Sequence, residues 1–278
     1  MKILILGSLT IDIIEGRLAS GGPALYCSLA AELLGLDYFC CGIKPKEYRW
    51  EVPRGHFLQS DGPVFEHKYE SNSRISKLLR VPGIYNSVLP NPANFDAVFI
   101  NPVYREFEAK LMKSVVNNAR AVIDAQGLVR IARDDRIEVT TISKEEFNII
   151  ESCWAIHISV DELPAFDVLP QKPLTVITFG ENGAKVRLGQ REYYIPAYRV
   201  DGNPTGAGDF FMVAFIAEYL RNKDLIEACL YAASLASLLV EGKIPRSLSS
   251  VRGMLKHLEP IIKSRMNKLR NGVRYRAL

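Results

Sequence analysis

Short apolar runs alternate with amphipathic stretches along most of the chain. Five of the runs have the length and continuous apolarity of buried strands: Lys2–Leu6, Ala97–Asn101, Ala121–Asp124, Ala155–Ile158 and Leu174–Thr178. Two stretches between them, Pro23–Leu34 and Glu106–Asn117, carry apolar residues at helical spacing. Because strands separated by helices form βαβ units, this pattern predicts an α/β fold with a mainly parallel sheet covered by helices on both faces.

The segment Val64–Val81 has a different pattern. Its polar and apolar positions alternate, and Ser71–Ser73 divides it into two arms, which is typical of a β-hairpin. A hairpin that stands apart from a parallel sheet could act as a small lid over a ligand site. The alternative is a surface hairpin with no functional role.

After Thr205 the pattern becomes wholly helical. The candidate helices are Phe210–Arg221, Leu225–Val240 and Ser249–Leu269. No internal repeat, low-complexity linker or break in composition divides the chain, so we expect a single domain over residues 1–278.

The charge is concentrated at the C-terminal end. The 35 Lys and Arg residues exceed the 31 Asp and Glu residues, giving a net charge of +4. Residues 256–278 hold seven basic side chains and one acidic one, a net +6, so the preceding 255 residues sum to −2. A basic stripe is therefore missing from the body, which argues against nucleic-acid binding and leaves a basic C-terminal helix or tail as its only support.

Composition narrows the class further. The chain is 48% hydrophobic and 24% charged, as in soluble globular proteins. Its most apolar stretch, Ala228–Val240, is shorter than the roughly 18–20 residues that span a bilayer, and the N-terminus lacks a secretory pattern. We therefore expect a cytoplasmic protein without a membrane partner. Its five cysteines are odd in number and form no CxxC pair, so buried thiols are expected instead of disulfides or a zinc site.

The motif with the clearest chemistry is Pro204-Thr-Gly-Ala-Gly-Asp209, directly before an apolar helix. Gly206, Ala207 and Gly208 carry little side-chain bulk, so backbone N–H groups at the helix N-terminus can face an anion. The helix dipole favours negative charge at the same place. Asp209, in the first helical turn, places a carboxylate beside this anion cradle, although a bare glycine loop before a helix would have the same pattern.

The longer string PTGAGDFF resembles the C-terminal motif of the PfkB, or ribokinase-like, family of carbohydrate kinases. Other family elements follow in order: a first strand leading to Asp12, the Gly21-Gly22 pair, and a TxGxxG-like turn formed by Thr178, Gly180 and Gly183. The resemblance covers nearly the whole chain. It implies a ribokinase-like three-layer α/β/α fold with a small β lid, its strands near residues 10–20 and 63–82.

The resemblance also implies roles for individual residues. Asp209 would be the general base, with the N–H groups of Gly206, Ala207 and Gly208 stabilising the transferred phosphoryl group. Asp12 would bind acceptor hydroxyls, and Gly21 and Gly22 would let the acceptor approach the backbone. The nucleotide would be bound by Thr178, Gly180, Gly183, Thr205, Gly206 and Gly208. ATP and Mg²⁺ are the implied cofactors, since phosphoryl transfer depends mainly on positioning and charge stabilisation.

Two positions depart from the family pattern. Asn203 stands where many members have Asp, with Asp201 two residues earlier. In the family's Asn-x-x-Glu element, which organises Mg²⁺ and phosphate, Ser159 replaces the Asn and Glu162 is retained. Glu162 is thus the implied metal-site residue, with an acidic cap on a surface turn as the alternative.

Polar residues that follow two predicted strands narrow the acceptor. Asn101 and Arg105 follow one strand, and Asp124, Gln126 and Arg130 follow the next. Residues beyond the carboxyl ends of parallel strands line the ligand crevice, so we expect these side chains near Asp209. Asn101, Asp124 and Gln126 suit hydroxyl groups, while Arg105 or Arg130 could bind a phosphate or carboxylate. Capping of strands and helices is the structural alternative for each.

The segments NPVxRE and DxQGxxR resemble the archaeal branch of the family that includes myo-inositol kinase, and Gln126 is the position expected to separate this chain from ribokinases. The resemblance therefore implies an ATP-dependent kinase of a small cyclic polyol or sugar, with myo-inositol first. Ribokinase-, fructokinase- or nucleoside-type kinases remain open, as does a catalytically silent sugar-binding relative. A homodimer formed through the lid is a further expectation.

Overall fold

The computed structural model describes residues 1–70, 73–244 and 260. Its largest element is a nine-stranded sheet in which the two strands at one edge are antiparallel and all other neighbours are parallel. From edge to edge its strands are β15 (Arg191–Ile195), β14 (Ala184–Leu188), β13 (Leu174–Thr178), β12 (Ala155–Ser159), β9 (Ala121–Asp124), β8 (Ala97–Ile100), β1 (Lys2–Leu6), β4 (Asp37–Pro45) and β5 (Gly55–Ser60).

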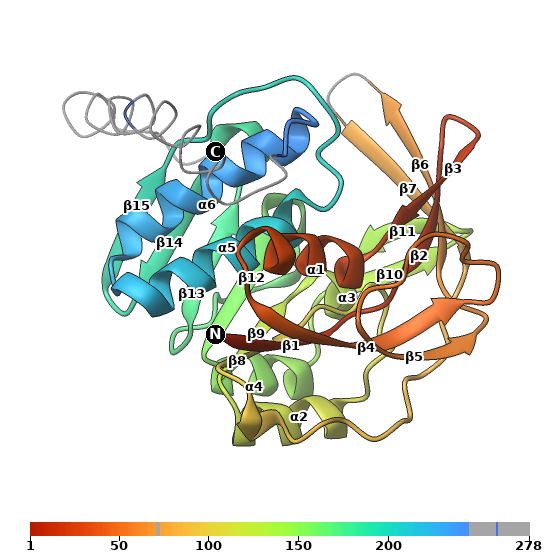
Figure 1. Cartoon of the computed structure of the whole chain (residues 1–278), viewed down its shortest axis with the longest axis horizontal. Coiled ribbons are helices and arrows are strands. Elements are labelled where there is room, and N and C mark those ends of the chain that lie inside the picture. The colour runs from red at the N-terminus through yellow and green to blue at the C-terminus, as the bar shows by residue number, and fades with distance from the viewer. Residues whose placement is uncertain (71–72, 245–259, 261–278) are drawn as a thin grey trace.

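Helices cover both faces of this sheet (Figure 1). The helices are α1 (Pro23–Leu33), α2 (Ala109–Asn118), α3 (Gln126–Val129), α4 (Lys144–Ser152), α5 (Ala207–Asn222) and α6 (Leu225–Val240), with 3₁₀ turns η1 (Pro92–Asn94), η2 (Val160–Ala165) and η3 (Gly180–Asn182). Helices α1, α5 and α6 pack on one face and α2 and α4 on the other. This confirms the α/β architecture that the strand pattern predicts, a mainly parallel sheet covered by helices on both faces.

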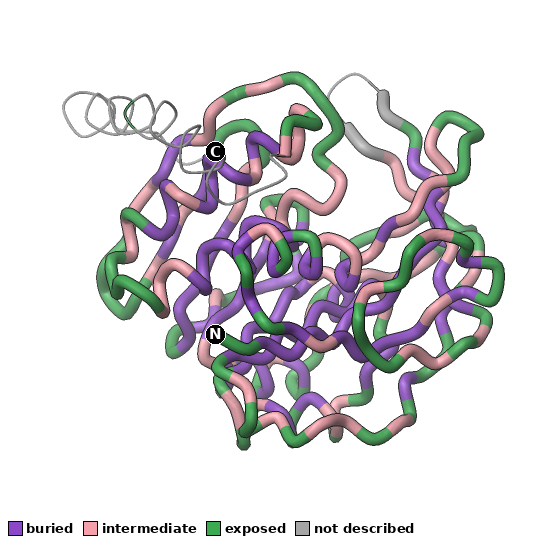
Figure 2. The backbone as a smooth tube through the Cα atoms, in the orientation of Figure 1, coloured by how far each residue is buried: buried purple, intermediate pink, exposed green. Residues whose placement is uncertain are grey.

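Strand β1 shows how the residue pattern builds these layers. Alternate side chains of a strand point to opposite faces of the sheet. Ile3 and Ile5 lie in the apolar core beneath α1 and α5, whereas Leu4 and Leu6 lie in the core beneath α2 and α4. Because both faces are covered, β8 and β9 are buried along their whole length and β1 is buried from Ile3 onward (Figure 2).

A second sheet of six strands stands beside the first, at the right of Figure 1. In order its strands are β10 (Arg130–Arg133), β11 (Arg136–Val139), β7 (Ser73–Arg80), β6 (Val64–Glu70), β2 (Thr10–Ile14) and β3 (Arg17–Gly21). All pairs are antiparallel except β2 with β6. Four of these strands lie where the lid strands were expected, while β10 and β11 were not predicted.

Two helix starts were predicted wrongly: α5 begins at Ala207 and not at Phe210, and α2 begins later than expected. The helix expected from Glu106 begins at Ala109. Glu106 is fully buried and its carboxylate accepts hydrogen bonds from the backbone N–H groups of Val103 and Tyr104 at 2.9 Å, so it closes a turn before the helix. Burial raises the pKa of this carboxyl, and the hydrogen bonds oppose the rise.

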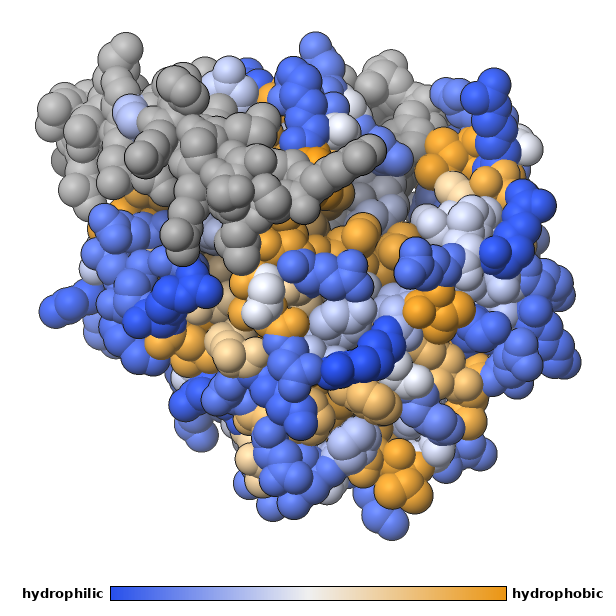
Figure 3. Space-filling view, viewed as in Figure 1, coloured by the Kyte–Doolittle hydropathy of each residue, from blue (hydrophilic) through white to orange (hydrophobic). Residues whose placement is uncertain are grey.

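The C-terminal segment, the cysteines and the surface complete the comparison with the sequence-based expectations. The helix expected at Ser249–Leu269 and the basic segment 256–278 lie, apart from Pro260, outside the described residues. Within the described part, no helix has both the length and the apolarity to cross a bilayer. All five cysteines are buried free thiols, as expected. The face drawn in Figure 3 is mainly hydrophilic, with smaller apolar groups between the polar ones.

Candidate active site

A cavity of about 240 Å³ lies between the second sheet and the carboxyl ends of the parallel strands. Its polar lining comes from both sides: Thr10, Asp12, His67, Ser76 and Arg130 from the second sheet, and Gln126, Ser159, Asp161, Glu162, Thr205 and Asp209 from the carboxyl end of β12 and from the turns and helices that follow β9, β12 and β15. Seven predicted site residues line this one cavity: Asp12, Gly22, Gln126, Glu162, Thr205, Gly206 and Asp209.

The anion cradle forms at the start of α5. Gly206 has φ of 77°, and a Cβ there would lie 2.1 Å from the Tyr26 ring, so both backbone and packing require glycine. The N–H groups of the first turn of a helix have no carbonyl partner four residues earlier. One correction concerns Ala207, whose N–H donates to the carbonyl of Pro204 at 3.1 Å within the turn. Asn203 supports the loop, because its Oδ1 accepts from the N–H of Thr205 at 3.0 Å.

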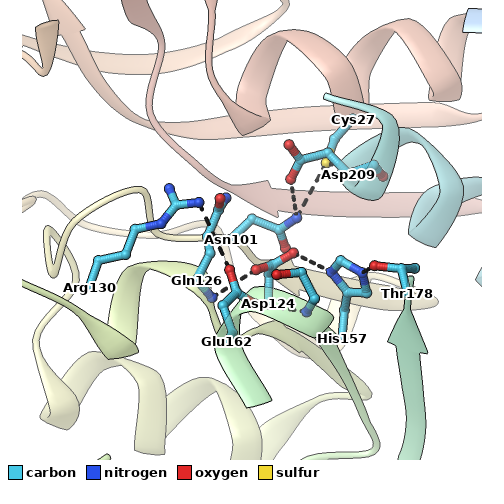
Figure 4. Close-up of polar contacts among 10 residues, drawn as sticks. Cys27, Asn101, Asp124, Gln126, Arg130, His157, Glu162, Thr178 and Asp209 are labelled. Carbon is cyan, nitrogen blue, oxygen red and sulfur yellow. Dashed lines mark hydrogen bonds and ion pairs between the residues drawn. The ribbon is translucent and has the colours of Figure 1, made fainter. Parts of the chain in front are cut away.

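Asp209 lies in the first turn of α5 and is buried, with 8% of its surface exposed. Asn101 Nδ2, at the end of β8, donates to Asp209 Oδ1 at 2.9 Å (Figure 4). Burial and the nearby Asp124 charge raise the pKa of Asp209 to about 7, against the opposing effect of the Asn101 hydrogen bond. A carboxyl that titrates near neutrality is suited to general-base chemistry.

The side-chain oxygen of Asn101 has no hydrogen-bond partner among the described residues. Its Nδ2 donates to Asp209 and also lies 3.6 Å from Cys27 Sγ, whereas its Oδ1 is buried and accepts no hydrogen bond from the described residues. An unpaired buried carbonyl oxygen is costly, and Asn101 is not among the residues that line the cavity.

The predicted residue Asp124 lies behind the cavity lining. Its Oδ1 accepts from the backbone N–H of Gln126 at 2.9 Å, and its Oδ2 contacts His157 Nδ1 at 2.6 Å. The other ring nitrogen, Nε2, lies 3.0 Å from Thr178 Oγ1. Thr178, which was expected to bind the nucleotide, therefore contacts His157. This histidine was not predicted from the sequence, because it lies inside an apolar strand pattern.

The lid side of the cavity also holds residues that were not predicted. Thr10 Oγ1 donates to Asp12 Oδ1 at 2.7 Å, and His67 Nε2 lies 3.7 Å from Asp12 Oδ2. His67 Nδ1 lies 2.9 Å from Ser76 Oγ, and its ring stacks on Phe65. Strand alternation was the available signal, because Phe65 and His67 are two residues apart on β6 and therefore point to the same face.

Some predicted residues lie elsewhere. Arg105 donates to Glu146 Oε1 at 2.6 Å and to the carbonyl of Leu128, and its guanidinium is not part of the cavity lining. Arg105 thus has a structural role, because its guanidinium forms an ion pair with Glu146 on α4. Gly180 and Gly183 shape the turn between β13 and β14, also away from the lining, and Gly21 leaves room for Asp12, whose Oδ2 would lie 2.1 Å from a Cβ at that position.

Glu162 combines a capping role with a place on the cavity. Its Oε2 accepts from the backbone N–H of Ser159 at 2.9 Å, and its Oε1 lies 3.9 Å from Arg130 Nη2. Burial and the Asp124 charge raise the pKa of Glu162 to about 7, and Arg130 opposes this rise.

Among residues 1–70 and 73–244, no three His, Cys, Asp or Glu side chains are arranged so that they could hold a metal ion together. Mg²⁺ is commonly bound through one or two carboxylates together with substrate phosphates. Glu162 and the neighbouring Asp161, both on the cavity, fit that kind of site.

The sequence of the chain matches a known protein family. The family described as pfkB family carbohydrate kinase matches residues 108–250, just over half of the chain. The chain belongs to the PfkB family. The matched segment includes β9, β12, the TxGxxG-like turn and the cradle at the start of α5.

Two kinases share sequence with the chain. The nucleoside kinase of Methanocaldococcus jannaschii is 27% identical over 164 residues, which cover 55% of this chain and 52% of that protein. The inositol 3-kinase of Arabidopsis thaliana is 24% identical over 266 residues, covering 86% and 74%. The match thus spans about half of the first relative's length and three quarters of the second's.

The fold is shared with solved kinases. A pyrophosphate-dependent kinase in the ribokinase family, complexed with a pyrophosphate analog and myo-inositol, superimposes with a TM-score of 0.70. The two chains are 19% identical, and the superposition covers 92% of this chain and all of the other. At this identity the likeness establishes the ribokinase-type fold.

Proposed function

We propose that this protein is a kinase that transfers the terminal phosphoryl group of ATP to a hydroxyl of a small cyclic polyol or sugar, with myo-inositol as the first candidate. The observation that carries the proposal is the position of Asp209. Its carboxyl is buried, has its pKa raised to about 7 and lies in the first helical turn beside the Gly206–Gly208 cradle, on a polar cavity.

The chemistry follows from this placement. Asp209 accepts the proton of the acceptor hydroxyl as that oxygen forms its bond to the γ-phosphorus, and the bond between the γ-phosphorus and the bridging oxygen breaks to release ADP. The start of α5 and its dipole stabilise the negative charge on the phosphoryl oxygens. Mg²⁺, when bound with the nucleotide near Glu162, supplies neutralisation of phosphate charge.

The lining supports a polyol acceptor. Asp12, His67, Ser76 and Gln126 offer hydrogen-bond donors and acceptors at several points around one small space. Its volume of about 240 Å³ is below the roughly 300–1,000 Å³ of pockets for drug-sized ligands, which favours a monosaccharide-sized acceptor. The similarity to an inositol 3-kinase over 86% of this chain points to myo-inositol within that class.

A nucleoside acceptor is the second candidate. The similarity to a nucleoside kinase supports it, as does the stacked pair Phe65 and His67, whose rings on the cavity wall could contact a base. The larger bicyclic acceptor would need more space than the cavity now has, so this proposal requires the second sheet to move.

An acceptor panel tests the proposal. Release of ADP is measured with myo-inositol, other cyclic polyols, ribose, fructose and nucleosides, with an acceptor-free blank to correct for ATP hydrolysis. We expect the highest kcat/KM with myo-inositol. A preference for nucleosides would select the second candidate, and absence of ADP release with every acceptor would leave a silent binding protein. A parallel series with pyrophosphate, followed by release of phosphate, tests the donor.

Two further proposals concern the second sheet. Closure of the β6–β7 hairpin over the acceptor would exclude water from the phosphoryl donor.

The face of the second sheet that points away from the cavity exposes Leu18 on β3 and Leu79 on β7, with 51% and 46% of their surfaces accessible, and this face could pair with a second copy of the chain. Hydrogen exchange with and without myo-inositol tests the first, and light scattering of wild-type protein and Leu79→Glu tests the second. Unchanged exchange or an unchanged monomeric mass would contradict them.

A further inference from the structure

A buried histidine lies beneath the anion cradle, and neither the family motif nor the polar cavity lining includes it. His157 belongs to β12 and is 4% exposed. It is the register partner of Asp124 on β9, and its ring spans the distance from that carboxylate to the hydroxyl of Thr178 on β13. Three neighbouring strand ends are therefore tied together by one imidazole (Figure 4).

The ring also touches the cradle. A Cβ on Gly208 would lie 2.9 Å from His157 Cε1, so the edge of the ring occupies the space that a side chain at position 208 would need. Cε1 lies between the two ring nitrogens. The part of the imidazole that carries much of the positive charge of the protonated ring is thus aimed at the first turn of α5.

The charges around His157 favour its protonated form. Burial lowers the pKa of His157, but the charge and hydrogen bond of Asp124, with the charges of Glu162 and Asp209, raise it above the usual value. These carboxylates come from β9, from η2 and from α5, while β13 contributes the uncharged Thr178. When protonated, Nδ1–H donates to Asp124 and Nε2–H donates to Thr178, so both ring nitrogens are satisfied.

We propose that His157 is a positioning residue, a buried imidazolium held by Asp124 and Thr178 that supports the Gly206–Gly208 cradle from below and strengthens its attraction for phosphoryl oxygens. The inference rests on the proposed kinase function. The imidazolium also fixes the direction of the Thr178 hydroxyl, because this hydroxyl accepts a hydrogen bond from His157 and its own hydrogen must then point away from the ring. The same cation keeps Asp209 ionised to lower pH, because its charge opposes protonation of that carboxyl.

The charge state is tested without any assay of activity. In ¹⁵N spectra of the full chain, the four histidines are distinguished by the signal that His157→Gln removes. We expect both ring nitrogens of His157 to be protonated at pH 7. Inorganic phosphate is then titrated while the Gly208 amide is observed, and His157→Gln should bind phosphate about tenfold more weakly. A neutral ring, or unchanged phosphate affinity, overturns the inference.

Kinetics provide a readout that a merely structural role would not move. His157→Gln should lower kcat about 10- to 100-fold and shift the acid limb of the kcat/KM profile to higher pH. Two controls are matched: Ile158→Val, a buried change on the same strand whose side chain faces the opposite core, and His56→Gln, an exposed histidine. Both should keep the wild-type limb. An unmoved limb in His157→Gln overturns the inference.

The failure of the inference and that of the proposed function are distinguishable. A wild-type protein that phosphorylates no acceptor contradicts the kinase function, whereas the nitrogen spectra and the phosphate titration still decide whether His157 is a cation supporting an anion site. An active wild-type protein with a neutral His157 contradicts the inference alone.

Discussion

The two walls of the cavity are built in different ways. On one side, which we call the cradle wall, the Gly206–Asp209 turn reaches the cavity, and Asn101, Asp124, His157 and Thr178 form a polar network next to it, outside the lining; these residues come from five elements or the turns after them. On the other, the lid wall, Thr10, Asp12, Phe65, His67 and Ser76 come from a single six-stranded sheet. The cradle wall is joined by contacts between residues far apart in sequence, whereas the lid wall is joined by neighbours within the sheet.

This difference separates chemistry from recognition. Polar groups clamped in a buried network need no reorganisation during a reaction, so they can stabilise charge as it develops. Side chains on a small sheet can instead follow the shape and hydroxyl pattern of an acceptor. Changes in the cradle wall should therefore lower kcat, and changes in the lid wall should raise the KM for the acceptor.

The strongest test of this division is Asp209→Asn. The amide cannot accept the acceptor proton, so kcat should fall by about 10²–10⁴, the usual contribution of general-base catalysis, while the KM for ATP stays nearly unchanged. Steady-state kinetics with the best acceptor measure this. Asp201→Asn, an exposed carboxylate in the preceding loop, should keep wild-type activity. Wild-type turnover in Asp209→Asn would show that another group takes the proton.

A second test changes the shape of the cradle wall. Gly206→Ala places a methyl group against Tyr26 at a φ of 77°, so the turn must shift and the first helical N–H groups lose their alignment. We expect kcat to fall about 10²-fold or more, as when one donor of an oxyanion hole is lost. Gly189→Ala is the control, because it also has positive φ but no atom near its Cβ. Equal kcat in the two variants would remove the cradle from the mechanism.

The pH dependence tests the electrostatics of the cradle wall. Asp209 must be ionised to act as a base, and burial raises its pKa to about 7. The kcat/KM of the wild type should therefore fall about tenfold per pH unit below this value and level off above it. A profile flat from pH 5 to pH 8 would contradict the assignment of Asp209 as the base.

The contrast between the walls also explains what the sequence could predict. Asn101 and Asp124 were expected near Asp209 because parallel strand ends converge, and Asn101 does contact it. His157 could not be found this way, since a lone histidine within the run Ala155–Ser159 reads as one more buried strand position. Only the register of β12 with β9 and β13 shows that its ring meets two polar partners.

The lid wall was harder to predict for another reason. Strand β10 has arginines at both ends, and β11 is exposed at three of its four positions, so their pattern resembles a polar loop. Strand β11 pairs with β7, about sixty residues earlier in the chain, and β10 pairs with β11. Arg105 was misjudged because position after a strand does not show which way a long side chain turns, and Glu146 on α4 draws its guanidinium away.

The smallest expected effect is in the lid wall and concerns His67. Its ring lies 3.7 Å from Asp12 and stacks on Phe65, which places it at the acceptor without contact to the cradle. His67→Gln keeps a hydrogen-bonding group but loses the flat ring, so the KM for the acceptor should rise about tenfold, the value of roughly one hydrogen bond, with kcat nearly constant. Glu66→Gln, the adjacent residue on the opposite face of β6, should leave both constants unchanged. If His67→Gln instead lowered kcat at saturating acceptor, the lid wall would take part in the chemical step and the division between the two walls would be wrong.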